Sequence, residues 1–270
     1  MGWSGMIGFV WESGSPVTVP PPATSAGRRP GVAVELNNVV CRASAAGPDD
    51  SGVAGISLQV PPGQSLALLS QPHGTATALF DVIAGLRRPR AGELRVDGVA
   101  VHRLGGRETS RYRAGRGLVS PRFPLLDALS VTGNVLAAPL AGGQGGAPAA
   151  ERAALLLEFA GVTRLTVPVE QLTAEERWRV MIARALVPSP RLVLAEDPAT
   201  QVDSRAADRV LDVLMDAHAR FGFTLVLAVE RLAAAVRCER RVCLVDGAVA
   251  EDEITGDEDE WTRSRVDRIG

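Results

Sequence analysis

The sequence contains no lysine, so arginine supplies all 29 of its basic residues. Any mechanism that requires a lysine ammonium, as a Schiff base, a phosphate clamp or a buried general base, is therefore excluded. Cysteine is also scarce: Cys41, Cys238 and Cys243 form no CxxC pair, which predicts buried, reduced thiols rather than a disulfide framework or a zinc site. Long apolar runs are missing too, since stretches such as 225–229 are far shorter than the ~20 residues of a membrane span.

Neither sign of charge dominates the chain, whose formal net charge is −2. This balance argues against nucleic acid as a partner, because nucleic-acid-binding domains carry a clear excess of basic residues. The 270 residues, 46% of them hydrophobic, are enough to build a sizeable α/β core without disulfides or metal.

The two ends of the chain differ in composition from its middle. Residues 1–30 are rich in proline, serine and glycine and predict a disordered leader, and their short apolar stretch at 6–11 lacks the basic flank of a signal peptide. Residues 251–270 are acidic and then mixed in charge, which predicts a flexible tail. A single domain is expected at 31–250.

Within that domain, short β-branched or leucine-rich runs alternate with helical patterns, and Asp97-Gly98 and Asp246-Gly247 are typical hairpin turns. Alternation of strand and helix in the second half predicts a parallel sheet covered by helices. Strands are expected at 32–40, 55–60, 65–69, 191–195, 223–229, 241–245 and 248–250, and a hairpin of two short strands around Asp97-Gly98 is expected at 93–99. Helices are expected at 75–85, 150–161, 174–187 and 203–219, and 142–150 is predicted to be a loop.

Three long segments carry a family resemblance: HGTATALFDVIAGLRRPRAGELRVDG, LVSPRFPLLDALSVTGNVLAAPL and ERWRVMIARALVPSPRLVLAEDPATQVDS. Together they resemble the ATP-binding subunit of ABC transporters, most closely the lipoprotein-release and macrolide-export type, over roughly residues 32–250. The resemblance implies an α/β cassette of the P-loop NTPase type with a mixed sheet core, an antiparallel β subdomain and a helical signature subdomain at about 125–187.

The phosphate loop departs from the family pattern G-x-x-x-x-G-K-[ST], in which glycines allow close approach and the lysine neutralises phosphate oxygens. The framing glycines are replaced by Ser70 and Thr75 and the lysine by Ala76, while Thr77 keeps the hydroxyl that would hold Mg²⁺. The resemblance implies nucleotide-binding positions at Ser70, His73, Gly74, Thr75, Ala76, Thr77 and Ala78. The aromatic residue that would stack on adenine aligns with Ala43.

The second acidic motif ends Glu196-Asp197, where the family has Asp-Glu. The resemblance makes Thr77 and Glu196 a possible Mg²⁺ pair and Asp197 the degenerate counterpart of the carboxylate that polarises the attacking water. A carboxylate pair that merely caps the strand end is the alternative. The family's switch histidine aligns with Glu230, a second degenerate catalytic position, and its magnesium-sensing glutamine aligns with Pro121.

The signature motif reads Leu172, Thr173, Ala174, Glu175 and Glu176, where the family has LSGGQ. Thr173 and Glu176 also have the spacing of a capping box for the helix that follows, and this reading explains both residues without a nucleotide. The resemblance further implies that Glu175 and Glu176 would face the triphosphate bound by a partner subunit.

These features predict a catalytically degenerate ATP-binding subunit of an ABC transporter, in which ATP and Mg²⁺ bind weakly. Its expected partners are a membrane permease subunit and a second ATP-binding subunit, as a homodimer or a heterodimer, at the inner face of the cell membrane. Two alternatives stay open: a working ATPase with an unorthodox loop, favoured by Thr77, Glu196 and Asp197, and a soluble regulator outside transport. Fold resemblance alone does not decide among them.

Overall fold

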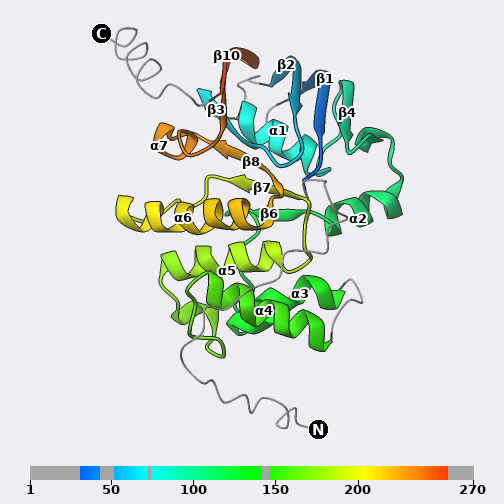
Figure 1. Ribbon diagram of the computed structural model, residues 1–270. Coiled ribbons are helices and arrows are strands. Elements are labelled where there is room, and N and C mark those ends of the chain that lie inside the picture. The colour runs from blue at the N-terminus through cyan, green and yellow to red at the C-terminus, as the bar shows by residue number, and fades with distance from the viewer. Residues whose placement is uncertain (1–30, 43–51, 72–73, 142–145, 255–270) are drawn as a thin grey trace.

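The computed structural model describes residues 31–42, 52–71, 74–141 and 146–254. The predicted leader, Ala43, His73 and most of the predicted tail lie outside these residues. Two sheets and seven α-helices are built from the described chain, and the sheets share one helix between them (Figure 1).

The larger sheet has six strands in the order β10-β9-β3-β8-β7-β6. Strands β9, β3, β8, β7 and β6 are parallel to one another, and β10 is antiparallel to β9. The central strands are buried along their whole length, which is why they read as continuous apolar runs. Their bounds are β3 Ser65–Gln71, β6 Gly117–Val119, β7 Leu192–Glu196, β8 Thr224–Val229, β9 Arg240–Val245 and β10 Ala248–Ile254.

The smaller sheet is antiparallel and has the order β2-β1-β4-β5, with bounds Val53–Val60, Val34–Cys41, Ala91–Val96 and Val99–Ala100. Helix α1, Thr75–Ile83, packs between the two sheets, and one apolar cluster joins its Leu79, Phe80 and Ile83 to residues of both. The predicted mixed sheet and antiparallel sheet are therefore confirmed.

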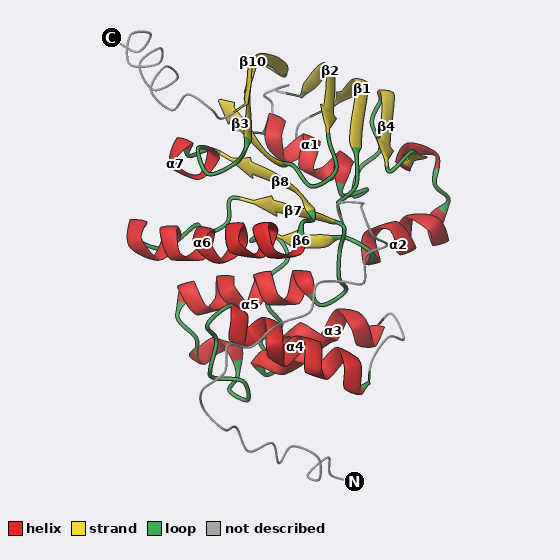
Figure 2. Cartoon of the chain, viewed as in Figure 1, coloured by secondary structure: helices red, strands yellow, loops and turns green. Residues whose placement is uncertain are grey.

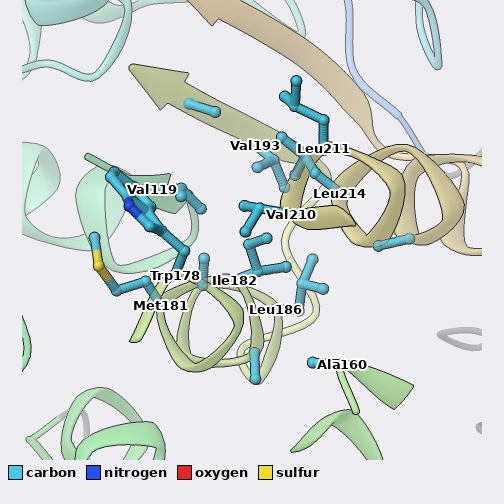
Figure 3. Packing of buried hydrophobic residues seen from close by; sticks show 14 of the residues in the cluster. Val119, Ala160, Trp178, Met181, Ile182, Leu186, Val193, Val210, Leu211 and Leu214 are labelled. Atoms are coloured by element: carbon cyan, nitrogen blue, oxygen red, sulfur yellow. The ribbon is translucent and has the colours of Figure 1, made fainter. Parts of the chain in front are cut away.

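Helix α2 packs on the same side as α1, where the Tyr112 hydroxyl donates to the Ile83 carbonyl. The other helices lie on the opposite side of the six-stranded sheet (Figure 2). Helix α6 lies next to the sheet and α5 lies beyond it, in contact with α3 and α4. In that second cluster Ile182 and Leu186 of α5 gather with Val210 and Leu214 of α6 (Figure 3). Full burial of each such side chain contributes about 1.5–3 kcal/mol. The bounds are α2 Gly106–Ala114, α3 Val131–Ala141, α4 Ala147–Phe159, α5 Ala174–Leu186, α6 Ser204–Phe221 and α7 Leu232–Ala235.

The predicted elements agree with the structure except at a few ends and omissions. Helix α4 begins at Ala147, inside the predicted loop, because Pro148 is well suited to the first turn of a helix. Strand β10 continues to Ile254 instead of ending at 250, because Asp252 pairs with Arg240 across β9 at 2.6 Å. The patterns did not predict α2, α3 or the three-residue strand β6.

The three cysteines are free and buried, as predicted. Burial raises the pKa of the Cys238 thiol to about 12 and also raises that of Cys41. None of the helices in the described part of the chain is both long and apolar enough to cross a bilayer.

Candidate functional site

The turn from β3 to α1 is the site where the sequence predicts nucleotide. Gly74 precedes the helix with φ 120°, a conformation that favours glycine, and no side chain caps the helix there. The first intrahelical bond runs from the Ala78 amide to the Gly74 carbonyl, so the amides of Thr75, Ala76 and Thr77 have no acceptor within the helix. A helix start of this kind can attract an anion through its amides and dipole.

Side chains at the same turn offer little chemistry to a phosphate. Ser70 is a buried residue of β3, paired in register with Leu244 of β9, and Ala78 is buried in the core. Thr75 and Ala76 are 2% and 4% exposed, and only Thr77 is half-buried. Backbone amides, rather than side chains, are therefore the groups that α1 can present.

Glu196, the last residue of β7, is 5% exposed and already bound on one oxygen by two donors. Ser120 donates its hydroxyl to Glu196 Oε2 at 2.7 Å, and Arg122 donates Nε to the same oxygen at 2.6 Å. A second nitrogen of Arg122 lies 2.8 Å from Asp81 Oδ1 on α1. Burial acts to lower the pKa of Arg122, but the hydrogen bonds with Glu196 and Asp81 outweigh it and the pKa is raised.

The described residues do not fit the magnesium site implied by the sequence. Within the described ranges no three His, Cys, Asp or Glu side chains gather where they could hold a metal. Mg²⁺ at a nucleotide site takes only one or two protein ligands and completes its shell with phosphate and water, so the fit depends on Glu196 itself. Mg²⁺ requires oxygen ligands in near-octahedral array, and the Glu196 carboxylate that would support it carries a guanidinium instead. The pairing of Thr77 with Glu196 as metal ligands therefore disagrees with the observed contacts of Glu196.

Asp197 and Glu230, the two degenerate catalytic positions, lie close together at the carboxyl ends of β7 and β8. The Glu230 amide donates to Asp197 Oδ1 at 3.2 Å, and the Asp197 amide donates to the Ala228 carbonyl at 2.9 Å. Asp197 has φ 37°, and Ala199 and Gln201 in the following loop also have positive φ. The Asp197 carboxylate thus helps to fix the end of β8.

The signature residues begin α5, and the predicted capping box is confirmed. The Glu176 amide donates to Thr173 Oγ1 at 3.2 Å, and the Thr173 amide donates to Glu176 Oε2 at 2.8 Å. Leu172 is buried in the helical cluster, and Ala174 is the first residue of the helix. Thr173 and Glu176 are therefore used by the chain itself.

Glu175 is held by two arginines, which the sequence did not predict. Arg179 donates two hydrogen bonds to Glu175 Oε1 at 3.1 and 2.7 Å, and Arg209 of α6 donates to both oxygens at 2.9 and 2.5 Å. Hydrogen bonding from Arg209 lowers the pKa of Glu175; burial opposes this effect, and Arg179 adds to it. Both signature carboxylates thus have partners within the chain, and the expectation that they face the triphosphate of a partner subunit stays a prediction.

The segment between β6 and α3 is fixed to the rest of the molecule at several points. Arg184 of α5 donates to the carbonyls of Phe123 and, at 2.8 Å, Pro124. Asn134, which is buried, accepts from the Leu126 amide at 2.6 Å and donates to the Leu126 carbonyl at 3.0 Å. The Leu126 side chain itself is 52% exposed. An ordered backbone thus presents an exposed apolar side chain.

The sequence-based alignment missed Ser120, Arg122 and Asp81, although Arg122 directly follows Pro121, the position aligned with the family's glutamine. Two features of the sequence offer a signal: the chain has no lysine, and its acidic motif begins with the longer Glu196. An arginine three residues beyond β6 can reach that carboxylate.

The fold is an α/β cassette of the P-loop NTPase type. Its features are a parallel sheet in which β3 leads directly into α1 at the carboxyl edge, an antiparallel sheet beside it and a helical insertion. The dimeric post-hydrolysis structure of the ATP-binding cassette MJ0796 bound to ADP and Pi has the same fold, with a TM-score of 0.74 and 24% identity over 83% of this chain and 99% of that one. The structure of cbiO1 from Clostridium perfringens, described as part of the ABC transporter complex cbiONQ, also matches, with a TM-score of 0.72, 18% identity, and coverage of 87% of this chain and 93% of that one.

Comparison of sequences identifies the family. A family model described as ABC transporter matches residues 53–200. The lipoprotein-releasing system ATP-binding protein LolD 1 of Rhodopirellula baltica is 34% identical over 206 residues, which are 76% of this chain and 90% of that protein. The macrolide export ATP-binding/permease protein MacB 1 of Aeromonas hydrophila is 34% identical over 229 residues, 80% of this chain and 34% of that protein. The chain belongs to the ABC transporter family, as its ATP-binding-cassette domain.

Proposed function

We propose that this chain is an ATP-binding-cassette subunit that docks on a membrane permease and hydrolyses ATP slowly or not at all. The observation that carries the proposal is the turn into α1, where the buried methyl group of Ala76 stands at the lysine position of the motif. Arg87 and Arg122, which both reach α1, contact Asp81 there at 3.4 and 2.8 Å. Phosphate binding at this turn would rest on helix amides without the motif's cation.

The docking part of the proposal is supported by the segment that presents Leu126. In the relatives, the printed names describe lipoprotein release and macrolide export, the latter by a protein that combines the cassette with a permease. Arg184 and Asn134 fix the backbone of the corresponding segment here, which lowers the entropy lost when a partner binds. A peripheral position at the inner face of the membrane, without a nucleic acid partner, follows from this proposal.

Pairing with a second cassette subunit is the other proposed contact. Helices α1 and α5 belong to separate apolar clusters on opposite faces of the six-stranded sheet. The phosphate turn and the signature of one chain therefore occupy separate parts of the molecule, which favours a site shared between two chains. A homodimer and a heterodimer are both compatible with this arrangement.

The permease proposal is tested by membrane association of the full chain in its own cells, with detergent-solubilised complexes purified and the permease subunit identified by mass spectrometry. The wild type is expected to copurify with one permease at a fixed ratio, and Leu126→Asp to reduce recovery at least fivefold. Val99→Asp is the matched control, because Val99 is 48% exposed on the distant strand β5. A chain that stays in the soluble fraction, or equal recovery of both variants, contradicts docking.

A working ATPase is the second candidate, and the uncapped amides of α1 together with the half-buried Thr77 favour it. Phosphate release by the purified complex distinguishes the two. Turnover near ~1 per second, as in slow kinases, supports the second candidate, and background release supports the proposed function.

A further inference from the structure

The cluster around Arg122 joins three parts of the cassette that are distant in sequence. Its carboxylates, Glu196 on β7 and Asp81 on α1, are 5% and 7% exposed, and its hydroxyl group, Ser120, is fully buried. Arg122 contacts both carboxylates, at 2.6 and 2.8 Å. Its guanidinium also lies over the ring of Phe80 on α1, 5.2 Å from the centroid. Such stacking adds to the attraction that fixes a guanidinium in place.

Charge within this cluster is already balanced. Glu196 and Asp81 supply two negative charges, and Arg122 and Arg87 supply two positive charges, since Arg87 lies 3.4 Å from Asp81 Oδ2. A divalent cation bound at Glu196 would leave a buried excess of positive charge, or it would have to expel Arg122 from its hydrogen bonds. Either event is costly where carboxylates are nearly removed from water.

We infer that the Arg122 guanidinium is the resident cation of this cassette at the second acidic motif, in the place where the family uses a divalent metal. The arginine neutralises Glu196 through its Oε2 oxygen, so the chain needs no metal to balance the charge of that carboxylate. It also ties the segment between β6 and α3 to α1 and β7 with bonds that need neither nucleotide nor metal. The position of that segment is thus set by the protein itself.

The inference rests on the family resemblance that places Glu196 at the metal-supporting position, whereas the proposed function rests on Ala76 at the turn into α1. Its test measures metal binding by the full-length chain without nucleotide or permease, so each can fail while the other holds. Mn²⁺ is the probe, and the loss of the electron paramagnetic resonance signal of free Mn²⁺ reports binding. The proteins compared are the wild type, Arg122→Gln, Glu196→Gln and the double variant.

Introduced alone, Glu196→Gln is expected to leave Mn²⁺ binding at the wild-type level. Arg122→Gln is expected to create a site at least tenfold tighter, which the added Glu196→Gln removes. Arg240→Gln serves as the matched control, because Arg240 is likewise held by two bonds to a carboxylate, that of Asp252, and its loss should create no such site. Wild-type binding that Glu196→Gln weakens, or no gain in Arg122→Gln, overturns the inference.

A second measurement covers the case in which Arg122→Gln does not fold. A ligand that binds only the folded state raises the unfolding midpoint as its concentration rises. The unfolding midpoint of the wild type is expected to stay constant as Mn²⁺ is added, as is that of Glu196→Gln. A rise in the wild type that Glu196→Gln abolishes would show a metal at Glu196 and overturn the inference.

Discussion

Ala76→Lys restores a cation to the turn into α1 and so tests directly whether the absent lysine weakens ATP binding. A hydrogen bond to a charged group contributes about 1.5–3 kcal/mol. Stacking of adenine on an aromatic ring contributes about 1 kcal/mol more, and Ala43 cannot supply it. Together these deficits amount to about 2.5–4 kcal/mol, or roughly 70-fold to 1,000-fold in dissociation constant.

The wild type is therefore expected to bind Mg-ATP roughly 70-fold to 1,000-fold more weakly than an intact site does. If an intact site has a dissociation constant of about 0.1 µM, the expected value is about 10–100 µM. Ala76→Lys should tighten binding by tenfold or more if the lysine stem can leave the pocket in which Ala76 is 4% exposed. Both are measured by equilibrium titration with a fluorescent ATP analogue, and displacement by unlabelled ATP serves as the control for nonspecific binding.

The same titration has a clear refuting result. Submicromolar binding by the wild type corresponds to more than about 8 kcal/mol, which the uncapped amides of α1 and the Thr77 hydroxyl are not expected to supply. Such a result would show that groups other than the motif's lysine neutralise the phosphates, and the proposed absence of turnover would lose its physical basis.

Three further predictions concern turnover, capping and pH. Ala76→Lys alone is expected to leave phosphate release at background, because catalytic groups that act as a unit do not contribute additively; turnover near ~1 per second would contradict this. Thr173→Ala is expected to lower the free energy of unfolding by about 1 kcal/mol in urea titration, while Thr173→Ser keeps the cap and the wild-type value. Arg209 lowers the pKa of Glu175 below its ordinary 4.5. The ion pair therefore stabilises the folded state above pH 4.5, and this stabilisation is lost as the pH falls through the lowered pKa. Glu175→Gln should therefore be less stable than wild type at pH 7, by about 1 kcal/mol, and the difference should shrink below pH 4.5; a difference that is independent of pH would contradict the role of charge.

The elements that the sequence predicted correctly are those determined by short-range patterns. Strands β7 and β8 are buried on both faces, so their apolar runs are visible without any partner. The capping box of α5 depends on Thr173 and Glu176, which are three residues apart, so its geometry follows from the helix itself. The mixed sheet and the antiparallel β subdomain were implied by family resemblance, and the structure confirms the fold class.

The chemistry of the site depended on contacts between residues far apart in the chain. Arg122 lies 74 residues from Glu196, and Arg209 lies 34 residues from Glu175, so no periodicity or local spacing could pair them. Sequence alone determined that no lysine is available and which carboxylates remain. Only the tertiary structure decided which guanidinium neutralises each of them, because Coulomb attraction and hydrogen bonding depend on distances that the packing of β6, β7, α1 and α6 sets.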